Sequence, residues 1–440
     1  MERKIFCLIF LFSIIHFAQA TPDSTKTRSS AEYIYMPSTS IFGIFDPVNV
    51  DMENNNFVFM AHSSFYTASN CFTVDFIKNF FGSGFITEEM KNNASENLTD
   101  LNTIGIDFYN GVWMMKKSKN DGDNIFLAGI EYNFEESSQF TDDLFHVAFY
   151  GNYDMQGETA DFSKSKFSLT SVMEYKVGML KIFDDNYNGF KLGATAGLVQ
   201  GLSGVDVKAP VGTMFTAEDG RYLDFDYDFS IYTSGENKPS LTSFTGAGFC
   251  FDIFGQAYFQ GPEITINAMI NDIGVVFWNN DPLKISGDST QRFEGIEIDN
   301  LFSSSTETTN GSSDSLLEIL GVVREDNAFS QALPARLNAS ATKSFSDKTF
   351  YLTFGTQYIF NTPYKPLFFV QTGKTLTPLQ LTLSVNAHIG GYGGFNAGID
   401  ITKNISDFLQ LKIGSNSLLG VISPASFTGS AAYGSLAVRF

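Results

Sequence analysis

The 440-residue chain carries a formal net charge of −20 at pH 7, from 28 basic and 48 acidic residues. This balance excludes nucleic acid as a partner, because phosphate neutralisation needs clustered Lys and Arg. Beyond the first twenty residues no apolar run reaches the ~18 residues of a membrane-spanning helix. Aromatic residues are nevertheless abundant, with 46 phenylalanines and 18 tyrosines.

The first twenty residues, MERKIFCLIFLFSIIHFAQA, have the three parts of a secretory signal peptide: a charged start, an apolar run and a small-residue site. Removing residues 1–20 takes away one net positive charge, so the mature chain carries −21 instead of −20. Two cysteines then remain, Cys71 and Cys250, which is too few for a disulfide framework. We expect two buried thiols, with a single bridge as the alternative.

In CFTVDFIKNFF, apolar residues recur at helical spacing and predict a short amphipathic helix in a loop. Two interpretations stay open for its apolar face: it packs on the rim of the fold, or it forms a hydrophobic surface over an opening. The residues of this face are Phe72, Phe76, Ile77 and Phe80. A second short helix is predicted at SSDSLLEILGVV, residues 312–323, where packing is again the blander interpretation.

From residue 54 onward, apolar and polar residues alternate in long stretches, as in β-strands with two different faces. In QLTLSVNAHI, every second residue from Leu381 to Ile389 is apolar and the residues between are polar. RYLDFDYDFSIY and FSLTSVMEYKVGM follow the same rule. The polar residues that we expect to face a wet interior are Asp224, Asp226, Asp228, Glu174, Lys176, Gln380, Asn386 and His388.

Strand length separates two all-β architectures. Strands of a soluble sandwich usually run about 5–6 residues, whereas these run ten or more. Long strands with one apolar face suit a bilayer, because only a closed barrel leaves no unpaired strand edge in hydrocarbon. The sequence therefore predicts an all-β fold: a transmembrane antiparallel up-and-down β-barrel with short loop helices.

The predicted strands number sixteen, or fourteen if one pair is loop. Turns such as NDGD, DDNYNG, AEDG, QGP and SDK are short and fall on one side of the barrel, while the long connections fall on the other, as in outer-membrane barrels. The long connections are 67–102, 135–165, 280–332 and 416–430. The predicted strands are 54–66, 103–117, 124–134, 166–182, 189–204, 211–217, 221–233, 243–259, 262–279, 333–345, 349–361, 365–374, 378–389, 394–403, 407–415 and 431–440.

The stretch INDIGVVFWNN changes the parity of its strand. Ile264 to Ile270 share one face, and then Ile273 to Phe277 share it, which predicts a β-bulge near Asp272-Ile273. Bulges often lie beside lateral openings, so this is where we expect a side gate. Trp278 is then expected at a membrane interface, where indole rings are common.

The last residues, YGSLAVRF, form an alternating strand that we expect to close the barrel by pairing with the first strand. Its pattern also resembles the C-terminal signal recognised by the barrel-assembly machinery of outer membranes. The residues of this predicted assembly signal are Tyr433, Leu436, Val438 and Phe440.

No catalytic constellation is found in the sequence, so we expect no enzyme, no cofactor and no metal. The GKT at Gly373 lacks the glycine five residues earlier that a phosphate loop needs. The GLSG at Gly201 lacks the residue between serine and glycine that a nucleophile elbow needs. The histidines are too scattered for metal-ligand spacing.

Five stretches in order resemble a barrel family of Bacteroidota outer membranes, related in architecture to FadL-type transport barrels and to PorV, a barrel of a secretion system. The stretches are FYGNYDMQGE, SVMEYKVGM, KLGATAGLVQGLSG, INDIGVVFWNN and LPARLNASATKSF, which with the barrel's end span roughly residues 54–440. This resemblance implies that residues 21–53 plug the lumen, the alternative being a periplasmic tail. One departure is Asp46-Pro47-Val48, where FadL-type proteins carry Asn-Pro-Ala, which puts FadL-like gating in doubt.

Two functions follow from the resemblance as expectations. The first is a FadL-like outer-membrane barrel that passes small or hydrophobic molecules. The alternative is a non-catalytic, PorV-like subunit of a secretion or outer-membrane assembly complex. Both imply both termini in the periplasm and contacts with outer-membrane lipid, the assembly machinery and, in the second case, other envelope proteins.

Overall fold

The computed structural model describes residues 42–52, 55–82, 84–119, 122–184, 188–234, 240–294, 321–345 and 349–440. The predicted signal peptide (1–20), most of the predicted plug (21–41) and most of the second predicted loop helix (312–320) lie outside these ranges. Val323, at the end of that predicted helix, begins a short strand instead. Among the described residues, no helix is long and apolar enough to cross a bilayer.

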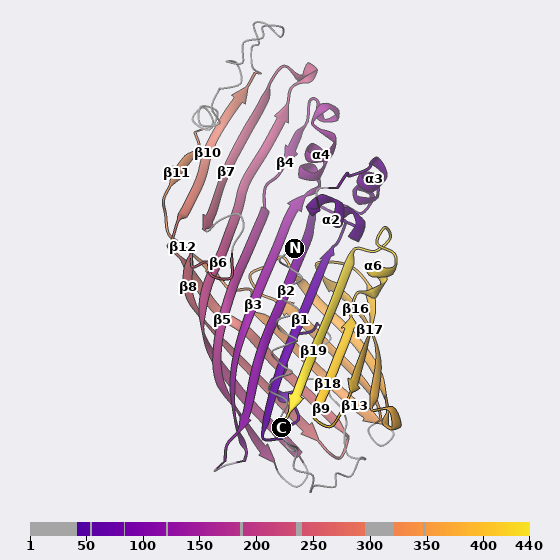
Figure 1. Cartoon of the computed structure of the whole chain (residues 1–440). Helices are drawn as coiled ribbons and strands as arrows, with labels where there is room; N and C mark the ends of the chain where they lie inside the picture. Colours follow the sequence, from indigo (N-terminus) through magenta and orange to yellow (C-terminus); the bar gives the residue numbers. More distant parts are fainter. Residues whose placement is uncertain are drawn as a thin grey trace.

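Fourteen antiparallel strands close into a ring (Figure 1), which confirms the predicted barrel. Each pairs with its neighbours in chain order, and the last pairs with the first through eleven positions from Val58↔Arg439 to Ala68↔Gly429. In ring order the strands are β1 (Phe57–Ser69), β2 (Leu101–Lys117), β3 (Asn124–Thr141), β5 (Ser165–Asp184), β6 (Asn188–Thr216), β8 (Gly246–Phe259), β9 (Ile264–Trp278), β13 (Arg336–Phe345), β14 (Phe350–Ile359), β15 (Lys365–Leu376), β16 (Leu381–Gly391), β17 (Asn396–Asn404), β18 (Leu409–Ser415) and β19 (Gly429–Arg439).

The helices in the described part of the chain are short, and apart from Pro47–Asn49, which precedes the first strand, they lie in connections between strands. Thr73, Thr87 and Thr141 begin the three longest, each accepting a backbone N–H of the first turn with its hydroxyl. The helices are η1 (Pro47–Asn49), α2 (Val74–Phe81), α3 (Glu88–Glu96), α4 (Asp142–Tyr150), η2 (Tyr153–Met155), η3 (Glu218–Gly220), η4 (Thr377–Leu379) and α6 (Leu418–Ile422).

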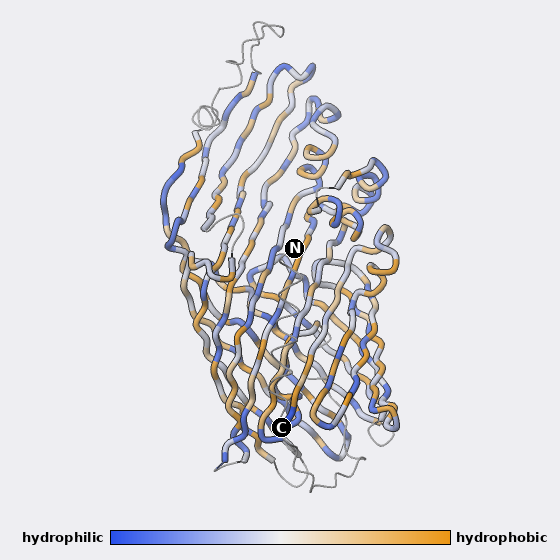
Figure 2. The backbone as a smooth tube through the Cα atoms, viewed as in Figure 1, coloured by the Kyte–Doolittle hydropathy of each residue, from blue (hydrophilic) through white to orange (hydrophobic). Residues whose placement is uncertain are grey.

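Apolar and polar residues alternate along the strands of the ring (Figure 2), and the outward-facing set is largely apolar while the buried inner set is largely polar. On β16, Leu383, Val385 and Ile389 are exposed, whereas Asn386 and His388 are buried on the inner side. Exposed phenylalanines also gather near the short turns, where an aromatic girdle meets a membrane interface. They are Phe126, Phe183, Phe190, Phe259, Phe345, Phe350, Phe408 and Phe440. A closed ring with this surface spans a bilayer.

A ribbon of strands stands beyond one side of the ring (Figure 1). It is made by the end of the 29-residue β6, which pairs with β7, and by β10, which pairs with β7. The predicted strand 211–217 is therefore the continuation of β6, and 221–233 is not a barrel strand. The number of barrel strands is therefore fourteen, the lower of the two predicted counts, and the count of sixteen is wrong. The AEDG turn at Ala217 lies on the side of the long connections and not, as predicted, on the side of the short turns. The additional strands are β4 (Thr159–Asp161), β7 (Leu223–Ser234), β10 (Pro282–Phe293), β11 (Val323–Glu325) and β12 (Phe329–Ala332).

The β-bulge predicted at Asp272-Ile273 is present. Asp272 has a positive φ of 62°, and the register between β8 and β9 shifts opposite it, between Phe251 and Ile253. The membrane-interface position predicted for Trp278 is wrong. After the bulge, even-numbered residues of β9 face inward, so the Trp278 ring is fully buried and its Nε1 donates to Gln331 Oε1 at 3.2 Å.

The two cysteines are free thiols, both buried, as expected. Burial raises the pKa of the Cys71 thiol, which lies in the connection after β1, to about 12. At neutral pH this group is therefore an unreactive thiol.

Candidate functional site

A group of buried charges inside the ring, which we call the septum, surrounds Lys176. Its Nζ lies 2.9 Å from Glu131, 2.8 Å from Glu174, 3.1 Å from Asp252 and 2.5 Å from Asp272. All five side chains are at most 5% exposed. Four carboxylates around one ammonium leave a formal excess of three negative charges, so Lys176 is the main compensating charge of the septum.

The bulge in β9 explains how the septum forms. By reversing the parity of the strand, it turns Asp272 inward next to Asn271, which already faces inward. The freed backbone N–H of Asp272 donates to Asp252 Oδ1 at 2.8 Å, and Thr195 donates to the other oxygen of Asp252 at 2.5 Å. A local backbone irregularity therefore places two carboxylates beside one lysine.

The septum continues through Glu131 to aromatic residues of β2. Trp113 Nε1 donates to one Glu131 oxygen at 2.8 Å, and the Tyr109 hydroxyl donates to the other at 2.9 Å. His62 Nε2 lies 3.4 Å from Glu131 Oε1. These groups satisfy both oxygens of a fully buried carboxylate, as burial of a charge requires.

A second ionic group joins nearly opposite walls of the ring. Arg336 at the start of β13 places Nη1 3.1 Å from Asp107 of β2 and Nη2 2.6 Å from Glu135 of β3. The other Glu135 oxygen accepts a hydrogen bond from the Tyr392 hydroxyl at 3.1 Å. The Tyr392 ring lies directly over Gly105, where a Cβ would clash with it at 2.1 Å. The Arg336 group therefore crosses the lumen.

Glu131, Glu174 and Asp272 offer three oxygens within 4.8 Å of one another, a spacing that suits a metal ion. The Lys176 ammonium, however, contacts all three carboxylates at 2.5 to 2.9 Å. The position that a cation would take is filled by the chain's own cation, so we assign no metal to these residues.

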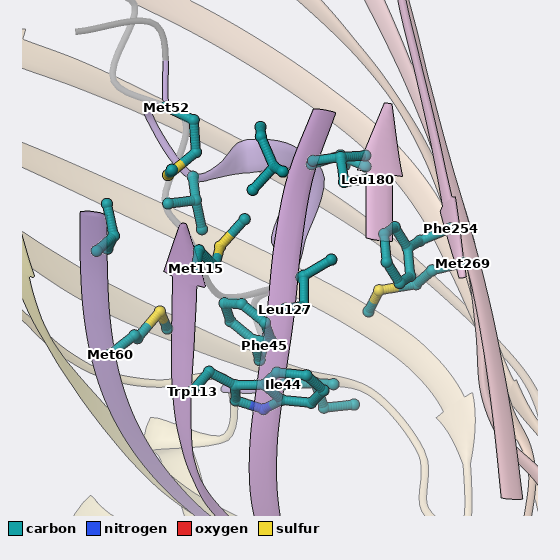
Figure 3. Close-up of a cluster of buried hydrophobic side chains, with 14 of the residues drawn as sticks. Ile44, Phe45, Met52, Met60, Trp113, Met115, Leu127, Leu180, Phe254 and Met269 are labelled. Carbon is teal, nitrogen blue, oxygen red and sulfur yellow. The ribbon is translucent and has the colours of Figure 1, made fainter. Parts of the chain in front are cut away.

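On the other side of Glu131, toward the short turns, the inner wall becomes apolar and encloses what we call the chamber. Its lining comes from six strands, and Figure 3 shows these side chains pointing toward the N-terminal segment. Polar inner faces are typical of water-filled barrels, so an apolar lining is a departure. The lining residues are Val58, Met60, Tyr109, Trp113, Met115, Ile125, Leu127, Leu180, Phe254 and Met269.

Residues 42–52 occupy the chamber. The Phe45 ring stacks on Trp113 with centroids 4.9 Å apart, and Ile44, Val48 and Met52 are nearly fully buried around it. The segment enters through Gly43, whose φ of +73° and whose contacts with Tyr433 and Ser64 leave no room for a Cβ.

Polar side chains of β6, β8 and β9 contact the segment. Lys191 Nζ donates to the Val48 carbonyl at 2.9 Å. Gln256 and Asn267 donate to Asn49 Oδ1 at 2.8 and 3.4 Å, and Asn49 donates to Asp46 Oδ2 at 2.7 Å. The segment is therefore held mainly by burial of apolar side chains, each contributing about 1.5–3 kcal/mol.

The polar residues predicted to line the lumen are only partly brought together. Glu174 and Lys176 meet in the septum, and Asn386 and His388 face the interior from β16. Gln380 is instead an exposed, left-handed residue in the turn after β15. Asp224, Asp226 and Asp228 lie on β7 in the ribbon, outside the closed ring, so their predicted position in the lumen is wrong.

In the ribbon, Asp224 pairs with Arg292 at 2.7 Å and Asp226 accepts from Thr290. The hydrogen bond from Arg292, together with its positive charge, holds the pKa of Asp224 below its usual value. These aspartates therefore act within the sheet of the ribbon.

The hydrophobic loop surface predicted on α2 is mostly internal. Phe72, Phe76 and Ile77 are buried against strand ends and α4, with the Phe72 and Phe76 rings 4.3 Å apart. Only Phe80 is exposed, at 55%. The packing interpretation is thus correct for three of the four residues.

In the predicted assembly signal, Tyr433 faces inward and contacts Gly43, and Leu436 and Val438 lie on the other face of β19, where Val438 is buried. Phe440, the residue after β19, is exposed. Recognition by the assembly machinery stays a prediction.

The sequence matches one family model, a family of unknown function named DUF5723, over residues 44–416. The chain belongs to DUF5723. No curated protein matches it. Solved structures similar to this DUF5723 barrel include the Pseudomonas putida toluene transporter TodX, at 8% identity and TM-score 0.44 over 90% of this chain and 92% of that one. A Pseudomonas aeruginosa FadL homologue matches at 8% identity and TM-score 0.40, over 93% and 95% of the two chains. The translocator domain of autotransporter NalP from Neisseria meningitidis matches at 8% identity and TM-score 0.34, over 90% and 92%.

Proposed function

We propose that this DUF5723 barrel lies in the outer membrane and passes small apolar molecules through a chamber that its own N-terminal segment closes. The observation that carries the proposal is the apolar lining of the chamber. Apolar side chains such as Trp113 and Leu127 do not stabilise an inner wall that contacts water. They do stabilise a wall that contacts apolar cargo, because the contact removes apolar surface from water. Three of the lining residues, Met60, Met115 and Met269, have flexible side chains that adapt to guests of different shape.

Residues 42–52 serve in this proposal as a displaceable occupant. Their apolar side chains take the place of cargo, and a handful of hydrogen bonds fixes their orientation. Beyond the chamber, the charges of the septum disfavour apolar cargo on the straight path, so cargo leaves or enters through the wall, whereas water and ions pass the septum once the segment is removed. The side gate predicted at the β9 bulge stays a prediction. There the ladder from β9 to β12 and β13 skips Asp272, Ile273 and Gly274, and Leu333 N donates to Gly274 O across the break at 3.0 Å.

Deleting residues 42–52 is expected to open the chamber. In planar bilayers the intact protein should show little conductance, and the deletion variant should conduct. In cells producing the deletion variant, uptake of the apolar dye N-phenyl-1-naphthylamine should rise. A matched control removes the same number of residues, 24–34, and keeps the chamber occupied. Unchanged conductance and dye uptake after deletion of 42–52 would refute the proposal.

Closure is also expected to depend on pH through Asp46, which is buried in the docked segment and has one oxygen without a hydrogen-bond partner. Burial raises the pKa of Asp46 to about 7, against opposing contributions from the Val48 backbone and Lys191. The docked segment therefore holds a proton that the released segment loses. The proton on Asp46 therefore stabilises the docked segment at low pH, and this stabilisation is lost as the pH rises through about 7.

The open fraction of the intact barrel should thus rise between pH 5 and 7, by up to about tenfold per unit, and level off above pH 8. Single-channel recordings across this range measure it. Asp46→Asn removes the titrating group and should abolish the pH dependence. Persistence of the same pH profile in Asp46→Asn would show that another group controls closure.

The ribbon supports a second candidate function, a non-catalytic subunit of an envelope complex. One face of β7 carries Leu223, Phe225, Tyr227, Phe229 and Ile231, all half-buried, and β7 stands beyond the ring (Figure 1). Apolar side chains outside the membrane favour contact with another protein. Co-purification of a fixed partner from native membranes, lost in Phe229→Asp but kept after deletion of 42–52, would favour this candidate over transport.

A further inference from the structure

A polar pair lies on the lipid-facing surface of the ring, where apolar residues are expected. On β1, Met60 and His62 face inward, so Ser63 faces outward, and it is exposed. Its hydroxyl donates to Oδ1 of Asn110 on β2 at 2.6 Å. Ser63 lies six positions from each end of β1, Phe57–Ser69. The pair is therefore at mid-height of a membrane-spanning strand, within the hydrocarbon layer.

The residues around this pair on β1 and β19 are small. Ser63 is paired with Gly434 of β19 on one side and with Asn110 on the other. Ala61 and Ala432 are its outward-facing neighbours on β1 and β19. Two positions further along β1 and β2, the rings of Phe65 and Phe108 contact each other with centroids 4.8 Å apart. Small side chains at one point of a membrane-facing surface allow another protein to approach closely.

The amide of Asn110 has unused hydrogen-bonding capacity. In the described part of the chain, its Nδ2 has no acceptor, and its Oδ1 accepts only from Ser63. An amide oxygen has two lone pairs, so one acceptor site and two donor hydrogens face hydrocarbon. Lipid tails cannot pair with them, and unpaired polar groups in hydrocarbon are costly. A partner that supplies both a donor and an acceptor at this depth would remove that cost.

We propose that the seam formed by Ala61, Ser63, Asn110, Ala432 and Gly434 is an in-membrane interface with the same seam of a second copy of this chain. An amide complements itself, since each Asn110 donates to and accepts from its counterpart across a two-fold axis. A symmetric pair of copies brings one surface patch against itself, which is the arrangement that a self-complementary amide satisfies. The small residues on β1 and β19 permit the two walls to approach.

Disulfide formation at the seam tests the pairing. Ser63→Cys should form a covalent dimer in oxidised, reconstituted membranes at low protein-to-lipid ratio. Ala341→Cys places an equally exposed outward thiol on β13, on the far side of the ring, and should remain monomeric. The unsubstituted protein, which carries the buried native thiols Cys71 and Cys250, gives the background yield of covalent dimer. Equal dimer yields from the two variants would overturn the proposal.

Association without cross-linking is measured by energy transfer between donor- and acceptor-labelled copies as the membranes are diluted with lipid. Asn110→Leu should weaken association by roughly three- to tenfold, because it removes the reciprocal amide bonds. Heat-modifiable mobility on gels shows that this variant still forms the barrel. Undiminished association of Asn110→Leu, or cross-linking of Ser63→Cys in native membranes only to a different protein, would refute a homotypic seam.

Discussion

Replacing Lys176 with methionine should lower the free energy of unfolding by about 3–5 kcal/mol, because it leaves four buried carboxylates without their shared cation. Methionine nearly matches the length of lysine, so the loss is electrostatic and not one of packing. Urea unfolding in lipid, followed by tryptophan fluorescence, measures the effect. Where the barrel fails to assemble, loss of the heat-modifiable band on gels reports the same result.

The control is Lys208→Met on β6, because the Lys208 side chain is 58% exposed and its Nζ lies 2.7 Å from Asp206. Surface pairs of this kind contribute about 0–1 kcal/mol, so this change should have little effect. Adding Asp252→Asn and Asp272→Asn to Lys176→Met removes two of the unpaired charges and should recover part of the loss. If Lys176→Met is as mild as Lys208→Met, the septum does not hold the ring as described.

Arg336→Met is expected to be comparably destabilising, by about 3–5 kcal/mol, since Asp107 and Glu135 then lose their common partner inside the lumen. Arg336→Lys should recover only part of the stability, because one ammonium does not reproduce two separate guanidinium contacts. The same urea titration measures both variants. The matched control is Arg292→Met in the ribbon, which breaks the half-exposed pair with Asp224 and should have little effect on the free energy of unfolding.

An Arg336→Met barrel as stable as Arg292→Met would contradict the assignment of Arg336 to a cross-lumen contact. A further readout distinguishes the two arginines. Loss of the Arg336 contacts should raise hydrogen exchange on β2, β3 and β13 together, because the guanidinium joins these three strands. Loss of Arg292 should change exchange only in β7 and β10.

Much of the ring was predictable from the sequence because a bilayer imposes one rule on every spanning strand. In QLTLSVNAHI that rule shows as strict alternation, and the structure places Leu383 and Val385 outward and Asn386 inward. The β9 bulge was predictable too, since a change of parity around Asp272 has few other physical causes. Trp278 was predicted at the membrane interface, but the same change of parity turns the even-numbered residues beyond the bulge inward, and Trp278 is one of them.

The ribbon could not be told from the ring by pattern alone. A sheet with one apolar face alternates in the same way whether lipid or another protein covers that face, so Asp224 and its neighbours looked like lumen residues. Strand pairing distinguishes the ribbon from the ring. The first part of β6 pairs with β8 and the rest pairs with β7, and a single sequence does not show which strands pair.

The apolar lining of the chamber has a signature in the sequence. In FVFM (57–60) and in GVWMMKK (111–117), consecutive residues are apolar on both faces of the strand. On a spanning strand, that pattern means that the inner face also contacts something apolar. The ionic groups were harder to foresee, because Lys176 and Arg336 meet partners that lie up to 96 and 229 positions away in the chain.

The most direct test of the account replaces Phe45 with the photo-reactive residue p-benzoylphenylalanine in the membrane-embedded protein. Irradiation followed by peptide mapping identifies what Phe45 contacts. The account predicts cross-links to the β2 peptide that contains Trp113 and to the β1 peptide that contains His62, whose rings lie 4.9 and 6.2 Å from Phe45. Cross-links to lipid or to other envelope proteins, with none to these two strands, would show that the N-terminal segment does not occupy the barrel.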